Sequence, residues 1–378
     1  MKDLISNSNI FFLLFIISCT SPTSDTIESR NEQELPQSNR FDIMRGVNIS
    51  HWLSQSNRRG EERSRWFQEE DVQFIKEVGF DHIRIPIDEE QMWNEAGDKE
   101  EEAFTLLHNA LSWSQKHELR AIVDLHILRS HHFNEKEKPL WVDSLAQEQF
   151  LNCWRDLSGE LKNYPLDQVA YELMNEPVAD DPDDWNKLVA KGVRVVRENE
   201  PFRKILIGSN RWQSTDTFDD LKLPENDPNI IVSFHFYTPM ALTHYKASWV
   251  ANGVYEGPVQ YPGEIIDKEN FEGLDAALAK VLKDAAGNYN RDSLEKLIMK
   301  PIKFAKERQL QVYCGEWGCL KTVPETAMLN WYSDVRSILE NNNVAWTIWD
   351  YKGNFGIKTG KNMLPDKPLI EVLTGTAL

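Results

Sequence analysis

The chain has 378 residues, with 42 Lys or Arg against 60 Asp or Glu, which gives a formal net charge of −18. Nucleic acids and anionic membrane surfaces attract a basic face, so this acidic balance argues against both as partners and suits an uncharged ligand. Hydrophobic residues make up 41% of the chain, which is enough for one large core, and a single folded domain is the simplest expectation.

The first segment is typical of an exported protein. An apolar run over residues 10–17 has the length of a signal-peptide core and is too short to span a bilayer as a helix. The run closes on Ile-Ile-Ser before Cys19, which resembles the lipobox of bacterial lipoproteins, where Cys19 would carry the lipid. We therefore expect a signal peptide over 1–19 and an outer-membrane or cell-surface lipoprotein. Ordinary export to the periplasm or the medium is the alternative.

Residues 20–40 are rich in Ser, Thr, Glu, Asn and Gln and are predicted to form a solvated tether. The domain that follows, 41–378, begins a regular alternation of strand and helix patterns. Eight short apolar runs are predicted strands: Ile43–Asn48, His82–Pro86, Ala121–His126, Val169–Glu176, Ile205–Ser209, Ile230–Tyr237, Gln311–Glu316 and Ala345–Asp350. Helical patterns separate most of them: Glu69–Val78, Glu100–His117, Leu145–Lys162, Trp185–Glu198, Arg291–Arg308 and Glu325–Asn341.

Eight strands alternating with helices predict an α/β fold of the (β/α)8 TIM-barrel type in one domain. The runner-up, an open doubly wound sheet, would need a Gly-rich phosphate turn after its first strand, and the sequence has none there. A long stretch after the sixth strand, 239–290, is rich in Pro, Gly and aromatic residues. Loops of this length are usually functional, and since it follows a strand we expect it over the catalytic face. Its Trp249, Tyr255 and Tyr261 are candidates for a substrate cleft.

Two of the predicted strands end at a glutamate. Glu176 stands before Pro177, which cannot continue a strand, and Glu316 closes the seventh strand. Residues at the carboxyl ends of barrel strands are the catalytic ones, and two carboxylates are the minimum set for cutting a glycosidic bond. Glu172 is a rival acid on the fourth strand. Alternation predicts that it is a buried structural acid, on the same face as Glu176 and opposite Asn175.

Further groups that suit sugar chemistry stand at other strand ends. They are Arg84, His126, Asn175, His235, Tyr237 and Trp349. With the two carboxylates, these motifs resemble glycoside hydrolase family 5, the cellulase-like family of retaining barrel glycosidases, over residues 43–350. The resemblance rests on Ile-Arg-Ile-Pro, Asp-Leu-His, Asn-Glu-Pro, His-Phe-Tyr, Cys-Gly-Glu-Trp-Gly and the final Trp.

The resemblance implies that Glu176 is the acid/base and Glu316 the nucleophile. Arg84 and Tyr237 would stabilise the ionised nucleophile, unless Arg84 merely pairs with a core acid, and the charge of Glu316 would raise the pKa of Glu176. The remaining expected roles are tuning of the acid/base by His235, sugar 2-OH binding by Asn175, binding of a neighbouring hydroxyl by His126, and a floor for the sugar ring from Trp349.

Other aromatic and sulfur-containing residues leave alternatives open. Trp212, after the fifth strand, either stacks on a leaving-side sugar or packs under the 239–290 stretch, and His131 and His132 are expected to be solvated loop residues. A disulfide between Cys314 and Cys319 is not expected, because five residues that begin in an extended strand reach beyond the ~7 Å Cα limit. No Cys or His cluster has metal-site spacing, so neither a metal nor another cofactor is implied.

The sequence thus predicts a monomeric retaining β-glycosidase that acts on a neutral polysaccharide, with endo-β-glucanase as the leading activity. β-Mannanase, xyloglucanase and exo-β-1,3- or β-1,6-glucanase remain alternatives within the family. A catalytically inactive glycan-binding lipoprotein is the alternative from another class, and the intact carboxylate pair argues against it because a pure binder needs neither acid.

The lipobox interpretation is tested by membrane partition. Expressed with its own signal in a Gram-negative host, the protein is expected to partition into detergent, because Cys19 would become the lipid-carrying N-terminus. A Cys19→Ala variant is expected to lose this partition in a Triton X-114 extraction. A variant that still partitions with the membranes would contradict lipidation at Cys19.

Overall fold

The structure, a computed structural model, describes residues 41–377. The expected signal peptide, the tether and the lipobox Cys19 lie outside the described residues. Among the described residues, no helix combines the length and the apolar character needed to cross a membrane. Cys153, Cys314 and Cys319 are buried free thiols, which confirms that Cys314 and Cys319 do not pair.

Eight parallel strands close into a barrel, and their order around it is β1-β10-β9-β6-β5-β4-β3-β2. Their bounds are β1 (Arg45–Asn48), β2 (His82–Asp88), β3 (Arg120–Ile127), β4 (Val169–Glu172), β5 (Ile205–Gly208), β6 (Ile230–Phe236), β9 (Gln311–Trp317) and β10 (Ala345–Ile348). Each strand lies beside its sequence neighbour, so the predicted (β/α)8 barrel is confirmed. Strand β4 is four residues shorter than predicted, since it ends at Glu172 rather than at Glu176.

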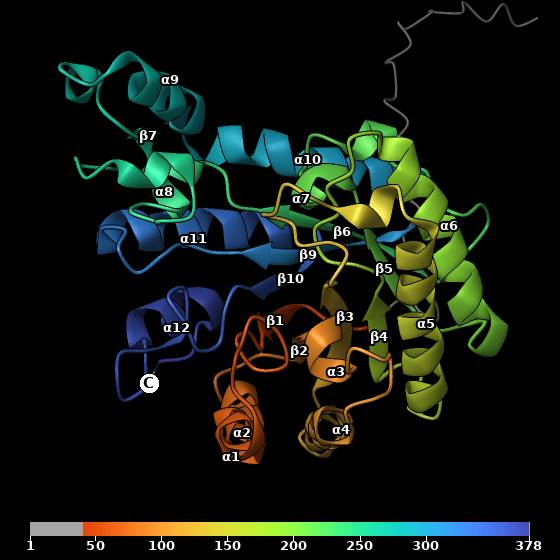
Figure 1. The fold of residues 1–378 in the computed structure, drawn as a ribbon. Coiled ribbons are helices and arrows are strands. Elements are labelled where there is room, and N and C mark those ends of the chain that lie inside the picture. Colours follow the sequence, from red (N-terminus) through yellow and green to blue (C-terminus); the bar gives the residue numbers. More distant parts are fainter. Residues whose placement is uncertain (1–40, 378) are drawn as a thin grey trace, which may run out of the picture. The chain divides into compact units, whose positions relative to one another are not determined.

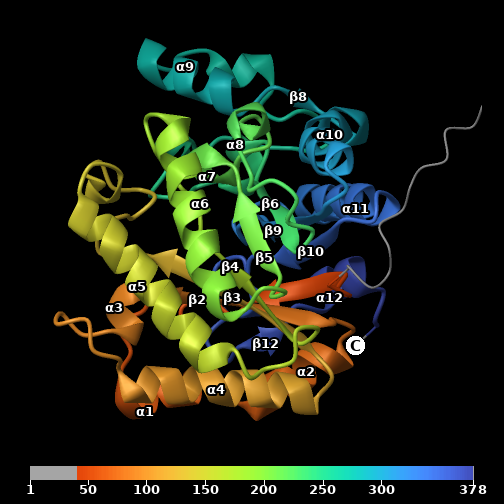
Figure 2. The same ribbon diagram turned by 90° about the vertical axis from the view of Figure 1, so that its right-hand side faces the viewer.

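Helices surround the strands in Figures 1 and 2. Those that match the predicted helical patterns are α2 (Glu69–Glu77), α4 (Glu101–Lys116), α5 (Ser144–Leu161), α6 (Pro182–Asn199), α10 (Arg291–Glu307) and α11 (Glu325–Asn341). Their apolar stripes produce this packing; on α4, for example, Ala103, Leu107 and Leu111 recur at helical spacing and are fully buried. The other α-helices of the described residues are α1 (Gly60–Trp66), α3 (Glu89–Met92), α7 (Asn210–Gln213), α8 (Met240–Thr243), α9 (Ala276–Ala285) and α12 (Lys367–Thr374).

The barrel interior near the amino ends of the strands is mainly apolar, apart from His82, which contacts Tyr313 and Thr347. A cluster of buried side chains fills it near the amino ends of the strands: Phe41, Ile43, Ile122, Ala170, Leu206, Ile231, Tyr313 and Ala345. Arg84 and its polar partners lie farther along the strands, toward the carboxyl ends, where the site lies.

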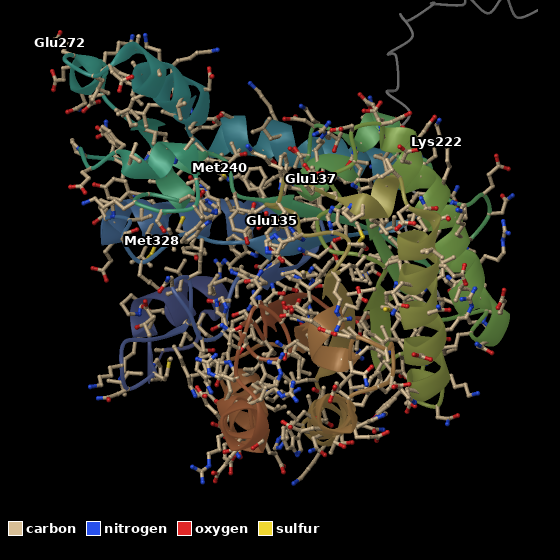
Figure 3. All side chains as sticks on the ribbon, in the orientation of Figure 1. Glu135, Glu137, Lys222, Met240, Glu272 and Met328 are labelled. Carbon is tan, nitrogen blue, oxygen red and sulfur yellow. The ribbon has the colours of Figure 1, made fainter. Side chains whose placement is uncertain are left out.

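The 239–290 stretch has its own short elements, including α8, α9 and an antiparallel pair of β7 (Gly263–Glu264) and β8 (Asn288–Tyr289). Tyr255 and Tyr261 are buried within it, and the Tyr261 hydroxyl donates to Asp334 on α11 at 2.7 Å. In Figures 1 and 2 α9 lies at the outer edge, and Figure 3 labels Glu272 at the tip of the same segment. Tyr255 and Tyr261 are therefore core residues of the stretch and do not line a cleft.

The start of this stretch is the part that meets the strand ends. The ring of His244 lies 5.1 Å from the ring of Tyr237, centroid to centroid. The same part of the stretch also docks on the loop after β9, where Leu320 N donates to Thr243 O at 2.9 Å. The expectation that the stretch covers the catalytic face is thus too broad, because its later elements pack against the outer helices.

Candidate active site

Arg84 is the centre of the polar network inside the barrel. It lies on β2, is completely buried, and its guanidinium has five N–H donors. The partners are Glu316 Oε1 and Asn48 Oδ1 at 2.8 Å from Nη1, Glu172 Oε2 at 2.6 Å from Nε, and Asn175 Oδ1 at 2.8 Å and Asp124 Oδ2 at 3.0 Å from Nη2. Arg84 is therefore the expected counter-charge of Glu316 and at the same time pairs with core acids.

Glu172 is a buried structural acid, as predicted. Its second oxygen accepts from Gln213 Nε2 at 2.8 Å. The predicted orientation is wrong, however, because Glu172 and Asn175 both contact Arg84 rather than pointing to opposite faces. Strand alternation does not extend to Asn175, since β4 ends at Glu172.

The two predicted catalytic carboxylates face one another across His235. Its Nδ1 lies 2.9 Å from Glu176 Oε1 and 3.6 Å from Glu316 Oε2. One oxygen of each carboxylate and a His235 ring nitrogen all lie within 4.8 Å of one another. The Tyr237 hydroxyl donates to Glu316 Oε2 at 2.9 Å, as expected. These four residues thus form one connected group at the ends of β4, β6 and β9.

A β-bulge places the nucleophile candidate. The pairing of β6 with β9 shifts by one residue, so that Phe234 pairs with Cys314 and His235 with Glu316. Gly315 is the extra residue. A Cβ there would lie 3.1 Å from Ser233 Oγ and 3.2 Å from His235 Nε2, so a larger residue would push the His235 ring. The close contacts at this position therefore explain why a glycine stands between Cys314 and Glu316.

The environment distinguishes the two carboxylates. Burial raises the pKa of Glu316, while Arg84 and the Tyr237 hydrogen bond lower it, and burial outweighs them. Burial also raises the pKa of Glu176, and there the charge of Glu316 raises it further, to well above its ordinary value. Arg84 and Tyr237 donate directly to Glu316 and so favour its ionised form. A proton shared by the two carboxylates therefore belongs on Glu176.

His126 is held as a neutral ring. Its Nδ1 lies 2.6 Å from Asp124 Oδ2, and its Nε2 lies 3.1 Å from the amide nitrogen of Gln55. Burial lowers the pKa of His126 to about 3. The amide of Gln55 therefore donates to Nε2, and Nδ1 donates to Asp124. The ring of Trp349 stacks parallel to His126, with 5.5 Å between the centroids.

Sequence reasoning missed several members of this network. Asn48 and Asp124 stand inside predicted strands and could have been found as polar residues near strand ends. Gln55 lies in the loop after β1 with a left-handed φ of 49° and carries no sequence signal. His131 is 1% exposed, so its expected solvation is wrong, whereas His132 is half-buried.

Trp212 and Trp249 are exposed on the rim. Trp212 is 45% exposed, and its Nε1 donates to Phe133 O in the loop after β3 at 3.2 Å. The ring is thus held by the loop after β3 and stays partly exposed, which favours the stacking alternative for Trp212. Trp249 is 52% exposed, with the ring of His244 at 6.2 Å, and remains a candidate for sugar contact.

A cavity of about 510 Å³ opens beyond Trp349. It lies between the loops after β1 and β10, and its lining includes His51, Gln55, Arg58, Trp66, Lys352 and Asn354. The ring of His51 meets that of Trp349 edge to face at 6.4 Å. Lys352 is anchored from behind by Asp71, with Nζ to Oδ2 at 2.8 Å. The cavity thus continues the polar surface of the site in one direction.

Comparisons with known proteins agree with this geometry. The family model for cellulase, glycosyl hydrolase family 5, matches residues 41–355. Endoglucanase C of Acetivibrio thermocellus is 30% identical over 312 residues, which cover 81% of this chain and 90% of the relative. Cellodextrinase A of Ruminococcus flavefaciens is 26% identical over 307 residues, which cover 80% of this chain and 84% of the relative.

Among solved structures, endoglucanase Cel5A of Thermotoga maritima superposes with a TM-score of 0.70 at 23% identity, covering 89% of this chain and 98% of that one. The clostridial cellulose synthase subunit Z of Clostridioides difficile gives a TM-score of 0.71 at 22% identity, covering 88% of this chain and 99% of that one. At these identities the two structures support the fold.

The Tyr237 hydrogen bond gives a prediction for pH dependence. A donor to Glu316 stabilises the ionised carboxylate and lowers its pKa, so Tyr237→Phe is expected to raise that pKa. The acid limb of the pH profile of kcat/KM on an aryl β-glycoside should move up accordingly. Tyr245→Phe, which loses a hydroxyl bond to Gly257 O instead, should leave the limb in place. An unmoved limb in folded Tyr237→Phe would contradict this coupling.

Proposed function

Because this chain belongs to glycosyl hydrolase family 5 and is a cellulase-like glycoside hydrolase, we propose that it is a retaining endo-β-glucanase acting on a neutral polysaccharide. The observation that carries the proposal is the carboxylate pair, Glu176 and Glu316, at the carboxyl ends of barrel strands. One oxygen of each lies within 4.8 Å of the other. Retaining enzymes hold their carboxyl groups ~5–5.5 Å apart, whereas inverting enzymes leave ~6.5–9.5 Å for a water. The spacing supports direct attack by a carboxylate.

In the proposed mechanism Glu316 is the nucleophile. Arg84 and Tyr237 donate to its two oxygens, so its charge is maintained in a buried site. Glu316 attacks the anomeric carbon, and a covalent glycosyl ester forms as the glycosidic bond breaks. The ester removes the charge of Glu316.

Glu176 supplies and then recovers the proton. Its raised pKa keeps it protonated beside ionised Glu316, so it protonates the leaving oxygen in the first step. Once Glu316 is esterified, the repulsion that raised this pKa is gone, and Glu176 is ionised to deprotonate water in the second step. His235, at 2.9 Å, orients the carboxyl group. We also assign the sugar contacts expected from the sequence to Asn175, the 2-OH partner, His126 and Trp349.

The barrel order gives the cleft a direction. In the ring of eight strands β4 lies opposite β10, and β5 lies opposite β1. Glu176 and Trp212 follow β4 and β5, so the leaving-side sugars lie there. The cavity beside His51 and Trp349 lies between the loops after β1 and β10 and would receive the sugars of the retained side. The cavity on the retained side and the exposed Trp212 ring on the leaving side together support attack at internal bonds.

β-Mannan is the second candidate substrate. Cel5A of Thermotoga maritima, a structural neighbour with a TM-score of 0.71 and 22% identity, was solved in complex with mannotriose. We place β-glucan first because the relatives that cover most of this chain are named for glucan or cellodextrin hydrolysis. Xyloglucan and exo-acting glucanase activity are the remaining alternatives.

We further propose that the enzyme works as a monomer outside the cytoplasm, held to a membrane by lipid at Cys19. The lipobox-like sequence before Cys19 supports the anchor. The proposed substrate supports a location outside the cytoplasm, because an uncut polysaccharide cannot cross a membrane to reach the enzyme.

Substrate and mode of action are tested together by product analysis. On soluble β-1,4-glucan the viscosity is expected to fall early relative to the release of reducing ends, because internal bonds are cut. Parallel assays on β-mannan and xyloglucan should give lower kcat/KM. Faster hydrolysis of mannan would transfer the assignment to β-mannanase, and release of short sugars without loss of viscosity would contradict endo action.

The two carboxylates are separated by chemical rescue. Glu176→Ala is expected to release dinitrophenolate from an aryl β-glycoside in a burst and then stall, because this leaving group needs no proton and the second step lacks its base. Azide should restore turnover of Glu176→Ala and yield a β-glycosyl azide. Without azide, Glu316→Ala is expected to be inactive. An α-azide from the Glu176 variant would exclude retention, and a β-azide from Glu316→Ala would reverse the two roles.

A further inference from the structure

The backbone of Glu176 has a conformation that L-residues rarely adopt. Its φ is 40°, in the left-handed region. In a continuing strand Asn175 and Glu176 would point to opposite faces. The left-handed turn breaks that alternation. As a result Asn175 reaches Arg84, and the next side chain reaches His235.

Hydrogen bonds from β3 and from the segments that follow β3 and β5 secure the backbone on both sides of Glu176. They are Gln213 Nε2 to Met174 O at 3.4 Å, Asn175 N to Leu125 O at 3.0 Å, Trp212 N to Pro177 O at 3.3 Å, Val178 N to His131 Nε2 at 3.1 Å, and two bonds between Ala179 and Asn210. An unfavourable φ persists only where surrounding contacts over-determine it. The bonds just after Glu176 therefore decide whether this conformation holds.

His131 supplies one of these bonds from the loop after β3. The ring is buried, and burial lowers its pKa to about 3, so it is neutral in any working buffer. Since Nε2 accepts from Val178 N, the ring proton lies on Nδ1. Trp141 packs edge to face against the ring at 5.2 Å. His131 is thus an immobilised acceptor for the backbone two residues beyond Glu176.

Asn210 supplies the other side-chain contact from the loop after β5. Its Oδ1 accepts from Ala179 N at 2.9 Å, and its Nδ2 donates to Ala179 O at 2.9 Å. This two-point contact fixes both the position and the orientation of the peptide. Together with His131 it ties the chain after Pro177 to the loops on either side of β4.

We propose that His131 and Asn210 are positioning residues that hold Glu176 in its left-handed conformation for proton transfer to the leaving group. The inference rests on the proposed acid/base role of Glu176. Proton transfer needs donor and acceptor within ~2.6–3.2 Å, and a displacement of about 1 Å costs on the order of 100-fold in rate. Loss of either contact therefore slows hydrolysis of substrates whose leaving group must be protonated. Substrates whose leaving group departs without a proton are unaffected.

The test compares His131→Leu with His131→Gln on aryl β-cellobiosides. For a phenyl leaving group kcat/KM of the Leu variant is expected to fall roughly 10- to 100-fold. For dinitrophenyl it should stay near the wild-type value, because that group leaves unprotonated. The Gln variant, whose amide oxygen can accept from Val178 N, should regain most of the loss. Equal losses on both substrates, no loss on either, or a Gln variant as slow as the Leu variant would each overturn the proposal.

Three further variants make the result specific. His108→Leu, on α4, should leave both substrates unaffected. Asn210→Ala carries the same expectation as His131→Leu and replaces it as the test if that variant does not fold. Glu176→Ala must show a larger loss of kcat/KM on the phenyl substrate than these variants do, with kcat/KM on the dinitrophenyl substrate again spared. If Glu176→Ala slows both substrates equally, the proposed acid/base role of Glu176 fails. If Glu176→Ala slows only the phenyl substrate but folded His131 and Asn210 variants do not, the positioning role alone is rejected.

Discussion

A single buried guanidinium organises the upper half of this barrel. Arg84 contacts side chains from β1, β9 and β3, and from β4 and the residues just beyond it, so each strand must keep its register for the network to form. A buried charge is costly unless it is paired and its hydrogen bonds are satisfied. Here four hydrogen bonds and an ion pair with Asp124 engage the guanidinium. Removing this side chain would leave Glu172, Asp124 and Glu316 buried without their cation, a loss on the order of 3–5 kcal/mol.

The same cluster also controls where protons reside. Four carboxyl groups surround one guanidinium, and a buried volume cannot hold all four ionised against one positive charge. Burial raises the pKa of Asp124 to about 7, and burial with the charge of Glu316 raises that of Glu176 well above its ordinary range. Direct contact with Arg84 favours charge on Glu316. Glu176 lacks this contact and would keep its proton, so the network that stabilises the barrel also distinguishes the two proposed catalytic roles.

Sequence patterns predicted the parts of the molecule that repeat. The bounds of α11 were predicted without error because Pro324 starts the helix and its apolar stripe is regular. The strand-end residues could also be predicted, since parallel strands carry their carboxyl ends to one face. Tyr261 could not be placed, because an aromatic residue in a long loop looks the same whether it lines a cleft or, as here, packs on α11. His131 was misplaced for a similar reason, since its burial depends on Trp141 and Val178.

The end of β4 shows where pattern reasoning stops. An apolar run that reaches Glu176 predicts a strand up to that residue, with side chains alternating between two faces. The strand ends at Glu172 instead, and the left-handed φ at Glu176 brings consecutive side chains to one site. Hydrogen bonds from loops that are distant in sequence hold this conformation. The secondary-structure propensities of the local residues do not predict such bonds. In this barrel the proposed reactive residues follow from residue type and strand position, whereas their alignment follows from contacts that only the assembled fold provides.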